Sequence, residues 1–121
     1  MERPSHKELN NKLHAALGAV HENRIILVEP GIIVAHAVEL GYSIRDELQQ
    51  VLLELLQYTG PEHYVGHRPP QKSYETRIHL LELWAFSVTC PMFDQRVYYK
   101  FSLKNDCFYL VSLHVSTSAT D

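Results

Sequence analysis

The stretch Arg96-Val-Tyr-Tyr-Lys-Phe-Ser-Leu-Lys-Asn-Asp-Cys-Phe-Tyr-Leu-Val-Ser-Leu-His-Val115 decides the fold. It contains two runs rich in β-branched and aromatic residues, at 95–103 and 108–115, which is typical of strands. Lys104-Asn105-Asp106 separates the runs and has the composition of a turn. Two strands joined by so short a turn pair antiparallel. The stretch therefore predicts a β-hairpin at the centre of a sheet.

The alternation of polar and apolar side chains predicts a register for this hairpin. A three-residue loop at 104–106 places apolar residues opposite one another on one face. On the polar face, that register places Tyr98 opposite Ser112 and Arg96 opposite His114. A two-residue loop would mix polar and apolar side chains on both faces, because a slip of one residue inverts every side chain of a strand. We therefore expect the three-residue loop.

The first half of the chain predicts three helices. Ser5 followed by Glu8 is a capping box, and Ser43 is a second N-cap. Gly41 ends the middle helix, since glycine readily adopts the left-handed conformation after a helix. The expected helices span about 6–21, 32–40 and 44–58. Their apolar residues at helical spacing are Leu9, Leu13, Leu17 and Val20 in the first helix and Leu48, Val51, Leu52, Leu55 and Leu56 in the third.

Other segments complete a single α+β domain. Residues 24–28 form a short apolar run before Pro30 and Gly31, which favours a non-helical conformation. Residues 61–73 contain three prolines and allow little helix. A third strand is expected at about 76–89. We expect one domain over residues 1–121, with a helical part at 5–58, a loop at 59–73 and a small antiparallel sheet at 74–116.

Composition narrows the class of protein. The chain has 121 residues, of which 45% are apolar, enough for one domain with its own core. No run approaches the roughly 18 apolar residues of a membrane span, and no apolar signal segment follows Met1. Cys90 and Cys107 fit neither a zinc nor a redox spacing, so we interpret them as buried free thiols. We therefore expect a cytoplasmic protein that does not contact a membrane.

The charge distribution favours a small RNA footprint. The net charge is −3, yet residues 60–104 hold six Lys and Arg against four Asp and Glu, together with three histidines. A local basic patch of this size suits a few phosphates better than a long duplex.

The polar face of the hairpin contains the first candidate site. His114 can transfer a proton near neutral pH. Tyr98 can orient a hydroxyl or stack on a base, and Lys100 can offset charge on a phosphate. Ser112 and Arg96 lie on the same face of the predicted hairpin. The alternative is a solvated strand face with no site.

The proline-stiffened loop adds His67, Arg68 and Lys72, which could bind phosphate near the sheet. The alternative is a solvated basic loop. His63 precedes His67 by four residues, the spacing of a zinc pair on a helix, but Gly66 and the prolines disfavour a helix here. We expect no metal site and no cofactor.

Residues 37–43 join two helices in the manner of a helix-turn-helix. The second helix, at 44–58, offers one arginine against three carboxylates, with a leucine-rich stripe. A DNA reader needs basic or amide side chains there, so this helix favours a core or a protein contact.

Both strands of the hairpin resemble those of a known family. Val97-Tyr-Tyr-Lys100 and Val111-Ser-Leu-His114 are similar to strands that read Val-Tyr-Leu-Lys and Val-Ser-Phe-Lys in the MqsR group of toxins. This group lies within the RelE-like mRNA interferases. Glu39-Leu-Gly41 and a strand holding Trp84 extend the similarity over about residues 37–115.

The resemblance implies a RelE-like α+β fold, cleavage of mRNA without a metal, and silencing by an antitoxin protein. The family's functional Tyr falls on Tyr98, and its C-terminal Lys falls on His114, which can still act as an acid or stabilise charge. The family's Gln after the strand Trp falls on Ala85, which cannot do that work. Its loop Lys is matched only loosely, by Lys72 or Arg68.

These considerations predict an mRNA-cleaving toxin of a toxin–antitoxin pair, acting on free mRNA or on the ribosome. The alternative is a non-enzymatic module that binds protein or RNA with the same face. The expected catalytic residues are Tyr98, His114 and Lys72, and the expected RNA-binding residues are His67, Arg68, Arg96, Lys100 and Ser112.

Overall fold

The computed structural model describes residues 3–116, so the C-terminal end from Ser118, which we expect to fray, lies outside the described residues. The helices are α1 (His6–His21), α2 (Pro30–Leu40) and α3 (Ile44–Tyr58), with short 3-10 turns η1 (Pro61–His63) and η2 (Thr76–Ile78). The strands are β1 (Ile25–Leu27), β2 (Trp84–Val88), β3 (Val97–Lys104) and β4 (Cys107–Val115).

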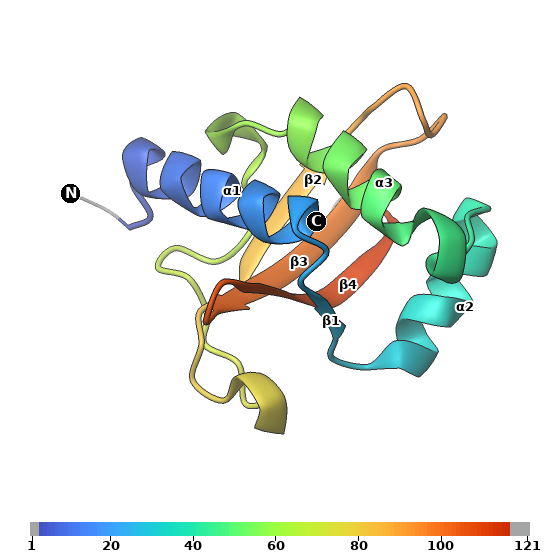
Figure 1. Ribbon diagram of the computed structural model, residues 1–121. Coiled ribbons are helices and arrows are strands. Elements are labelled where there is room, and N and C mark those ends of the chain that lie inside the picture. Colours follow the sequence, from blue (N-terminus) through green and yellow to red (C-terminus); the bar gives the residue numbers. More distant parts are fainter. Residues whose placement is uncertain (1–2, 117–121) are drawn as a thin grey trace.

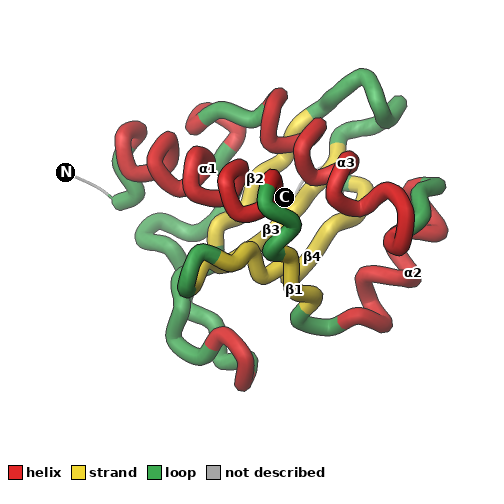
Figure 2. The backbone as a smooth tube through the Cα atoms, in the orientation of Figure 1, coloured by secondary structure: helices red, strands yellow, loops and turns green. Residues whose placement is uncertain are grey.

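The sheet and the helices form two layers, which confirms the α+β prediction. The strands lie in the order β1-β4-β3-β2, and α1 and α3 cross one face of the sheet (Figure 1). Long loops connect the helical layer to β2 (Figure 2). The core between the layers is built from Trp84, Phe86, Tyr99, Phe101, Phe108, Leu110, Leu52 and Leu55.

The prediction of an antiparallel sheet was wrong in one respect, because the observed sheet is mixed. β2, β3 and β4 are antiparallel neighbours, but β1 pairs parallel to β4. β1 comes from the apolar run at 24–28, whose non-helical conformation is confirmed. Its partner lies about 80 residues later in the chain, and local patterns do not encode such a pairing.

Local signals in the sequence position the helices correctly. Ser5 Oγ accepts a hydrogen bond from the Glu8 backbone N–H at 3.0 Å, and Ser43 caps α3 in the same way. Gly41 ends α2 with a φ of 82°, as expected. The apolar stripe predicted for α3 is buried. In α1, Leu17 shares the helical spacing of Leu9 and Leu13 but is 38% exposed. The smaller Ala16 takes the core position of α1 instead.

The predicted register of the hairpin is wrong. The turn has two residues, Asn105 and Asp106, both with positive φ, and this conformation matches the twist of a tight hairpin. A bulge in β4 near Val111 then shifts the register by one residue. Tyr98 consequently lies opposite His114 and not opposite Ser112, which faces Lys100. The bulge restores the separation of polar and apolar faces that an unbroken two-residue hairpin would lose.

Arg96 does not pair with His114 as predicted, because the observed register places Tyr98 opposite His114 and Val97 opposite Val115. Its backbone carbonyl accepts a hydrogen bond from Ser116 N at 2.9 Å, beyond the end of the ladder.

The strand predicted at 76–89 is shorter, which corrects that prediction. Residues 76–78 form η2, and Leu80 has a φ of 64°, a left-handed conformation that interrupts a strand. β2 begins only at Trp84. No helix within residues 3–116 is long and apolar enough to cross a membrane.

Candidate active site

A polar pocket of about 310 Å³ opens on the sheet. Tyr98 and Lys100 alternate along β3 with the buried Val97 and Tyr99, so they project from the face opposite α1 and α3. The pocket combines residues of three strands with a loop that runs along the edge of β2. It is lined by Val65, Gly66, His67, Gln71, Leu83, Ala85, Tyr98, Lys100, Ser112 and His114. None of these described residues is an Asp or Glu, so its only charged side chains are cations.

A stack of rings forms one wall of the pocket. The rings of Tyr98 and His114 lie with centroids 5.0 Å apart and planes 23° from parallel. The corrected register causes this contact, because it places the two residues directly opposite each other. His36 of α2 also contacts His114, at 5.0 Å between centroids and 57° between planes. His114 is thus in contact with two rings.

The hydrogen bond of His114 determines which nitrogen can take a proton. Nδ1 of His114 lies 2.8 Å from the carbonyl oxygen of Val115. A carbonyl oxygen only accepts, so Nδ1 must carry the hydrogen. In the neutral ring, Nε2 then holds the lone pair and can act as a base, and in the charged ring Nε2 can act as an acid.

A tyrosine holds the loop that carries His67. The hydroxyl of Tyr64 donates to the backbone carbonyl of His67, and burial raises the pKa of Tyr64 to about 12, so this donor keeps its proton at neutral pH. Arg68 lies over the Tyr64 ring, 5.0 Å from its centroid. A Cβ at Gly66 would lie 2.6 Å from the Tyr64 hydroxyl, so the loop requires glycine there. These contacts fix His67 at the pocket.

The structure brings together five of the eight residues expected at the site: His67, Tyr98, Lys100, Ser112 and His114. The other three lie elsewhere. Lys72 lines a separate hollow with Arg3, and Arg68 lies over Tyr64 with its guanidinium 3.4 Å from the Pro4 carbonyl. Arg96 precedes β3 and does not line the pocket.

Sequence reasoning missed Gln71 and His36. Gln71 lines the pocket because its backbone carbonyl accepts a hydrogen bond from Leu83 N at 2.8 Å, which draws the loop alongside β2. His36 lies on α2 three residues after the buried Ile33 and one before the buried Ala37. A polar residue on the buried side of an apolar helix is a signal that could have identified it. Its Nδ1 is buried with no hydrogen-bond partner among the described residues.

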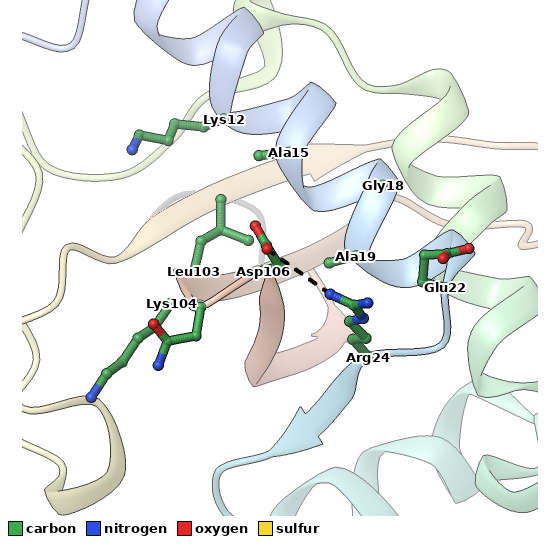
Figure 3. Close-up of a pocket in the computed structure, with 10 residues that line it drawn as sticks. Lys12, Ala15, Gly18, Ala19, Glu22, Arg24, Leu103, Lys104 and Asp106 are labelled. Atoms are coloured by element: carbon green, nitrogen blue, oxygen red, sulfur yellow. Dashed lines mark ion pairs between the residues drawn. The ribbon is translucent and has the colours of Figure 1, made fainter.

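A larger hollow, of about 540 Å³, lies between α1 and the β3–β4 turn (Figure 3). Arg24 and Asp106 face each other across it at 4.0 Å, and Glu22 adds a second carboxylate (Figure 3). Its cations are therefore partly neutralised, and it contains no histidine or tyrosine. The smaller pocket on the sheet has the better chemistry for a phosphate ligand.

No group of three or more His, Cys, Asp or Glu within residues 3–116 is arranged to hold a metal ion. Nδ1 of His63 accepts a hydrogen bond from Gly60 N at 2.9 Å. Both cysteines are free thiols, as expected, but only Cys90 is buried; Cys107 is half-buried.

Comparison of the chain with protein-family models gives no match, and comparison with curated proteins gives none either. The function of the chain is therefore inferred from the geometry and chemistry of the pocket.

Proposed function

We propose that the chain is the toxin of a toxin–antitoxin pair, a metal-independent endoribonuclease that cleaves mRNA in the cytoplasm. The observation that supports this most strongly is the composition of the pocket. Two histidines, a tyrosine and a lysine from separate segments line one cavity, and no carboxylate of residues 3–116 lines it. Such a set suits a phosphodiester with a neighbouring hydroxyl, which needs a base, an acid and a cation.

The proposed reaction uses these groups in one displacement. Nε2 of His114 takes the proton of the 2′-hydroxyl, and the 2′-oxygen attacks the adjacent phosphorus. The bond between phosphorus and the 5′-oxygen breaks, and the leaving oxygen takes a proton from the protonated His67. The products are a 2′,3′-cyclic phosphate and a 5′-hydroxyl. Proton transfer by positioned side chains contributes typically 10²–10⁴-fold to the rate.

The remaining residues support the reaction. Lys100 stabilises the negative charge that develops on the phosphate oxygens. This is most effective because no carboxylate among the described residues lines the pocket and competes for it. Tyr98 orients the 2′-hydroxyl beside His114, whose ring it stacks upon. The RelE-like relationship and the antitoxin partner belong to this proposal, and they rest on the resemblance of β3 and β4 to the MqsR strands.

One observation favours a second candidate, a module that binds RNA without cleaving it. Lys72, expected in the catalytic set, lies with Arg3 and Lys12 at a different hollow. Of the two lysines expected at the site, Lys72 and Lys100, only Lys100 lines the pocket.

Expression in bacterial cells tests the toxin. Wild-type protein should arrest growth and translation, whereas His114→Ala and Tyr98→Phe should relieve the arrest at equal protein level. Lys104→Ala is the matched control, because Lys104 lies on the same strand as Lys100 but outside the pocket. If wild-type protein arrests neither growth nor translation, the toxin proposal fails.

A further inference from the structure

Residues 73–81 form a loop that projects beyond the end of the sheet, with η2 near its tip (Figures 1 and 2). Its side chains are unusual for a solvent-exposed loop. Tyr74 is 79% exposed, and its ring lies 6.2 Å from that of His79. Arg77 is exposed as well, and it makes no ion pair within residues 3–116. Two aromatic rings and an unpaired cation are thus presented to solvent.

The loop starts at the pocket. Gln71 lines the pocket, and its backbone pairs with that of Leu83. The next pair outward in this short two-stranded ladder is Lys72 with Glu82. Ser73 follows at the base of the loop, where its carbonyl accepts a hydrogen bond from Leu80 N. Tyr74 follows Gln71 by three residues of extended chain, roughly 10 Å. Because side chains alternate along an extended chain, Tyr74 lies on the same side as Lys72. A ligand strand that leaves the pocket at Gln71 and crosses the edge of this ladder therefore reaches Tyr74.

The loop is pre-formed. Ile78 is fully buried and anchors it, and Leu80 is held at a φ of 64° by a hydrogen bond from its N–H to the Ser73 carbonyl at 2.7 Å. Ser73 N in turn bonds to the Leu81 carbonyl at 2.9 Å. Leucine rarely adopts this conformation, and such outliers persist only where surrounding bonds enforce them. Because the loop is already ordered, binding loses little conformational entropy there.

We propose that residues 73–81 are a second binding site for single-stranded RNA, at which a base next to the cleaved segment stacks on Tyr74 beside His79 while Arg77 contacts its phosphate. Exposed aromatic rings beside a cation are the means by which proteins hold unpaired bases without sequence preference. This inference rests on the proposed RNA substrate of the pocket. It assigns that substrate an extended, unpaired strand that reaches beyond the pocket.

Binding of a labelled 2′-O-methyl RNA of about 10 nucleotides, within the range of single-strand sites, tests the inference. This RNA lacks the attacking hydroxyl, so it reports binding without cleavage. Tyr74→Ala should weaken binding between about 5- and 150-fold, and Tyr74→Phe should retain it, because stacking needs the ring and not the hydroxyl. Tyr58→Ala is the matched control, since Tyr58 is 47% exposed at the end of α3. Arg77→Gln should lower the salt dependence of log Kd by about 0.7, the contribution of one phosphate contact.

The outcomes separate this inference from the proposed enzyme. Tyr74-dependent binding by a protein that cleaves natural RNA neither alone nor with ribosomes present overturns the enzyme and supports the RNA site on the loop. If the wild-type protein cleaves natural RNA and Tyr74→Ala binds RNA as tightly as wild type, the proposed RNA site at residues 73–81 is overturned and the enzyme is supported. Absence of any single-stranded RNA binding overturns the proposed RNA site at residues 73–81. Capture of a protein that depends on Tyr74, by a chain that binds no RNA, overturns it as well. Movement of the His79 ring signals in an NMR titration with the RNA should accompany binding.

Discussion

Tyr99, in the centre of β3, allows a quantitative test of the core that supports the pocket. The Tyr99 side chain is fully buried, and its hydroxyl donates to Thr59 Oγ1 at 2.7 Å. Thr59 in turn donates to the Leu55 carbonyl at 2.6 Å. Burial raises the pKa of Tyr99 well above its usual value, so the hydroxyl is a neutral donor at all working pH values.

The two single variants should differ in their effect on the free energy of unfolding. Tyr99→Phe removes one hydrogen bond but leaves Thr59 bonded to Leu55, so it should cost about 1 kcal/mol. Thr59→Val leaves the buried Tyr99 hydroxyl without an acceptor, which should cost about 2 kcal/mol. The double variant removes both hydroxyls and leaves no unsatisfied donor. It should therefore cost about 2 kcal/mol and not the 3 kcal/mol of the sum, a coupling of about 1 kcal/mol.

Urea unfolding of the four proteins measures these values, with unchanged slopes as the control for a common unfolded state. Two results would refute the reasoning. One is a double variant whose cost equals the sum of the singles, since no coupling would then exist. The other is a Thr59→Val variant less destabilised than Tyr99→Phe.

Three further predictions concern the ends and edges of the fold. The hydrogen bond from Arg3 lowers the pKa of Glu8 in the folded protein. The Glu8 carboxylate therefore stabilises the fold above the unfolded-state pKa of about 4.3, and this stabilisation is lost as pH falls through the lower folded-state pKa. Glu8→Gln should therefore lose less stability than wild type between pH 7 and pH 3 in urea titrations; an equal loss contradicts this. Gly66→Ala should displace the Tyr64 hydroxyl that holds the His67 loop, and so lower RNA cleavage or RNA binding. The midpoint of thermal unfolding should change by only a few degrees. Unchanged RNA cleavage and binding would contradict the role of Tyr64 in positioning this loop. Deletion of Val111 should leave a folded protein by circular dichroism, because it removes the bulge without inverting the faces of β4; an unfolded product would show that the bulge itself is required.

Sequence patterns predicted those parts of the fold that depend on local chemistry. Ser5 and Ser43 are caps, Gly41 ends a helix, and the leucine stripe of α3 is buried, because each signal acts within one or two turns. The hairpin was predicted as an element but not in its register. The turn at Asn105 has the residue types of a two-residue hairpin, yet the bulge that makes this turn compatible with the core depends on packing across the sheet.

The candidate site was predicted in part for the same reason. Tyr98 and His114 were identified from alternation along single strands, and both line the pocket. Their stacking, and the contact with His36, result from the corrected register and from the packing of α2 beside β4. Lys72 was expected in the pocket, but successive residues of an extended chain point to opposite sides. Gln71 therefore occupies the position, and Lys72 points to another hollow.

The central claim is that the pocket between β3, β4 and the loop at His67 cleaves RNA. Purified protein, incubated with single-stranded RNA in excess EDTA and followed by mass spectrometry of the fragment ends, tests it most directly. Wild-type protein should give 2′,3′-cyclic phosphate and 5′-hydroxyl ends, and His114→Ala should lower the rate by about 10²–10⁴-fold. Intact RNA, on its own and with ribosomes present, or fragments produced equally by His114→Ala, would contradict the claim.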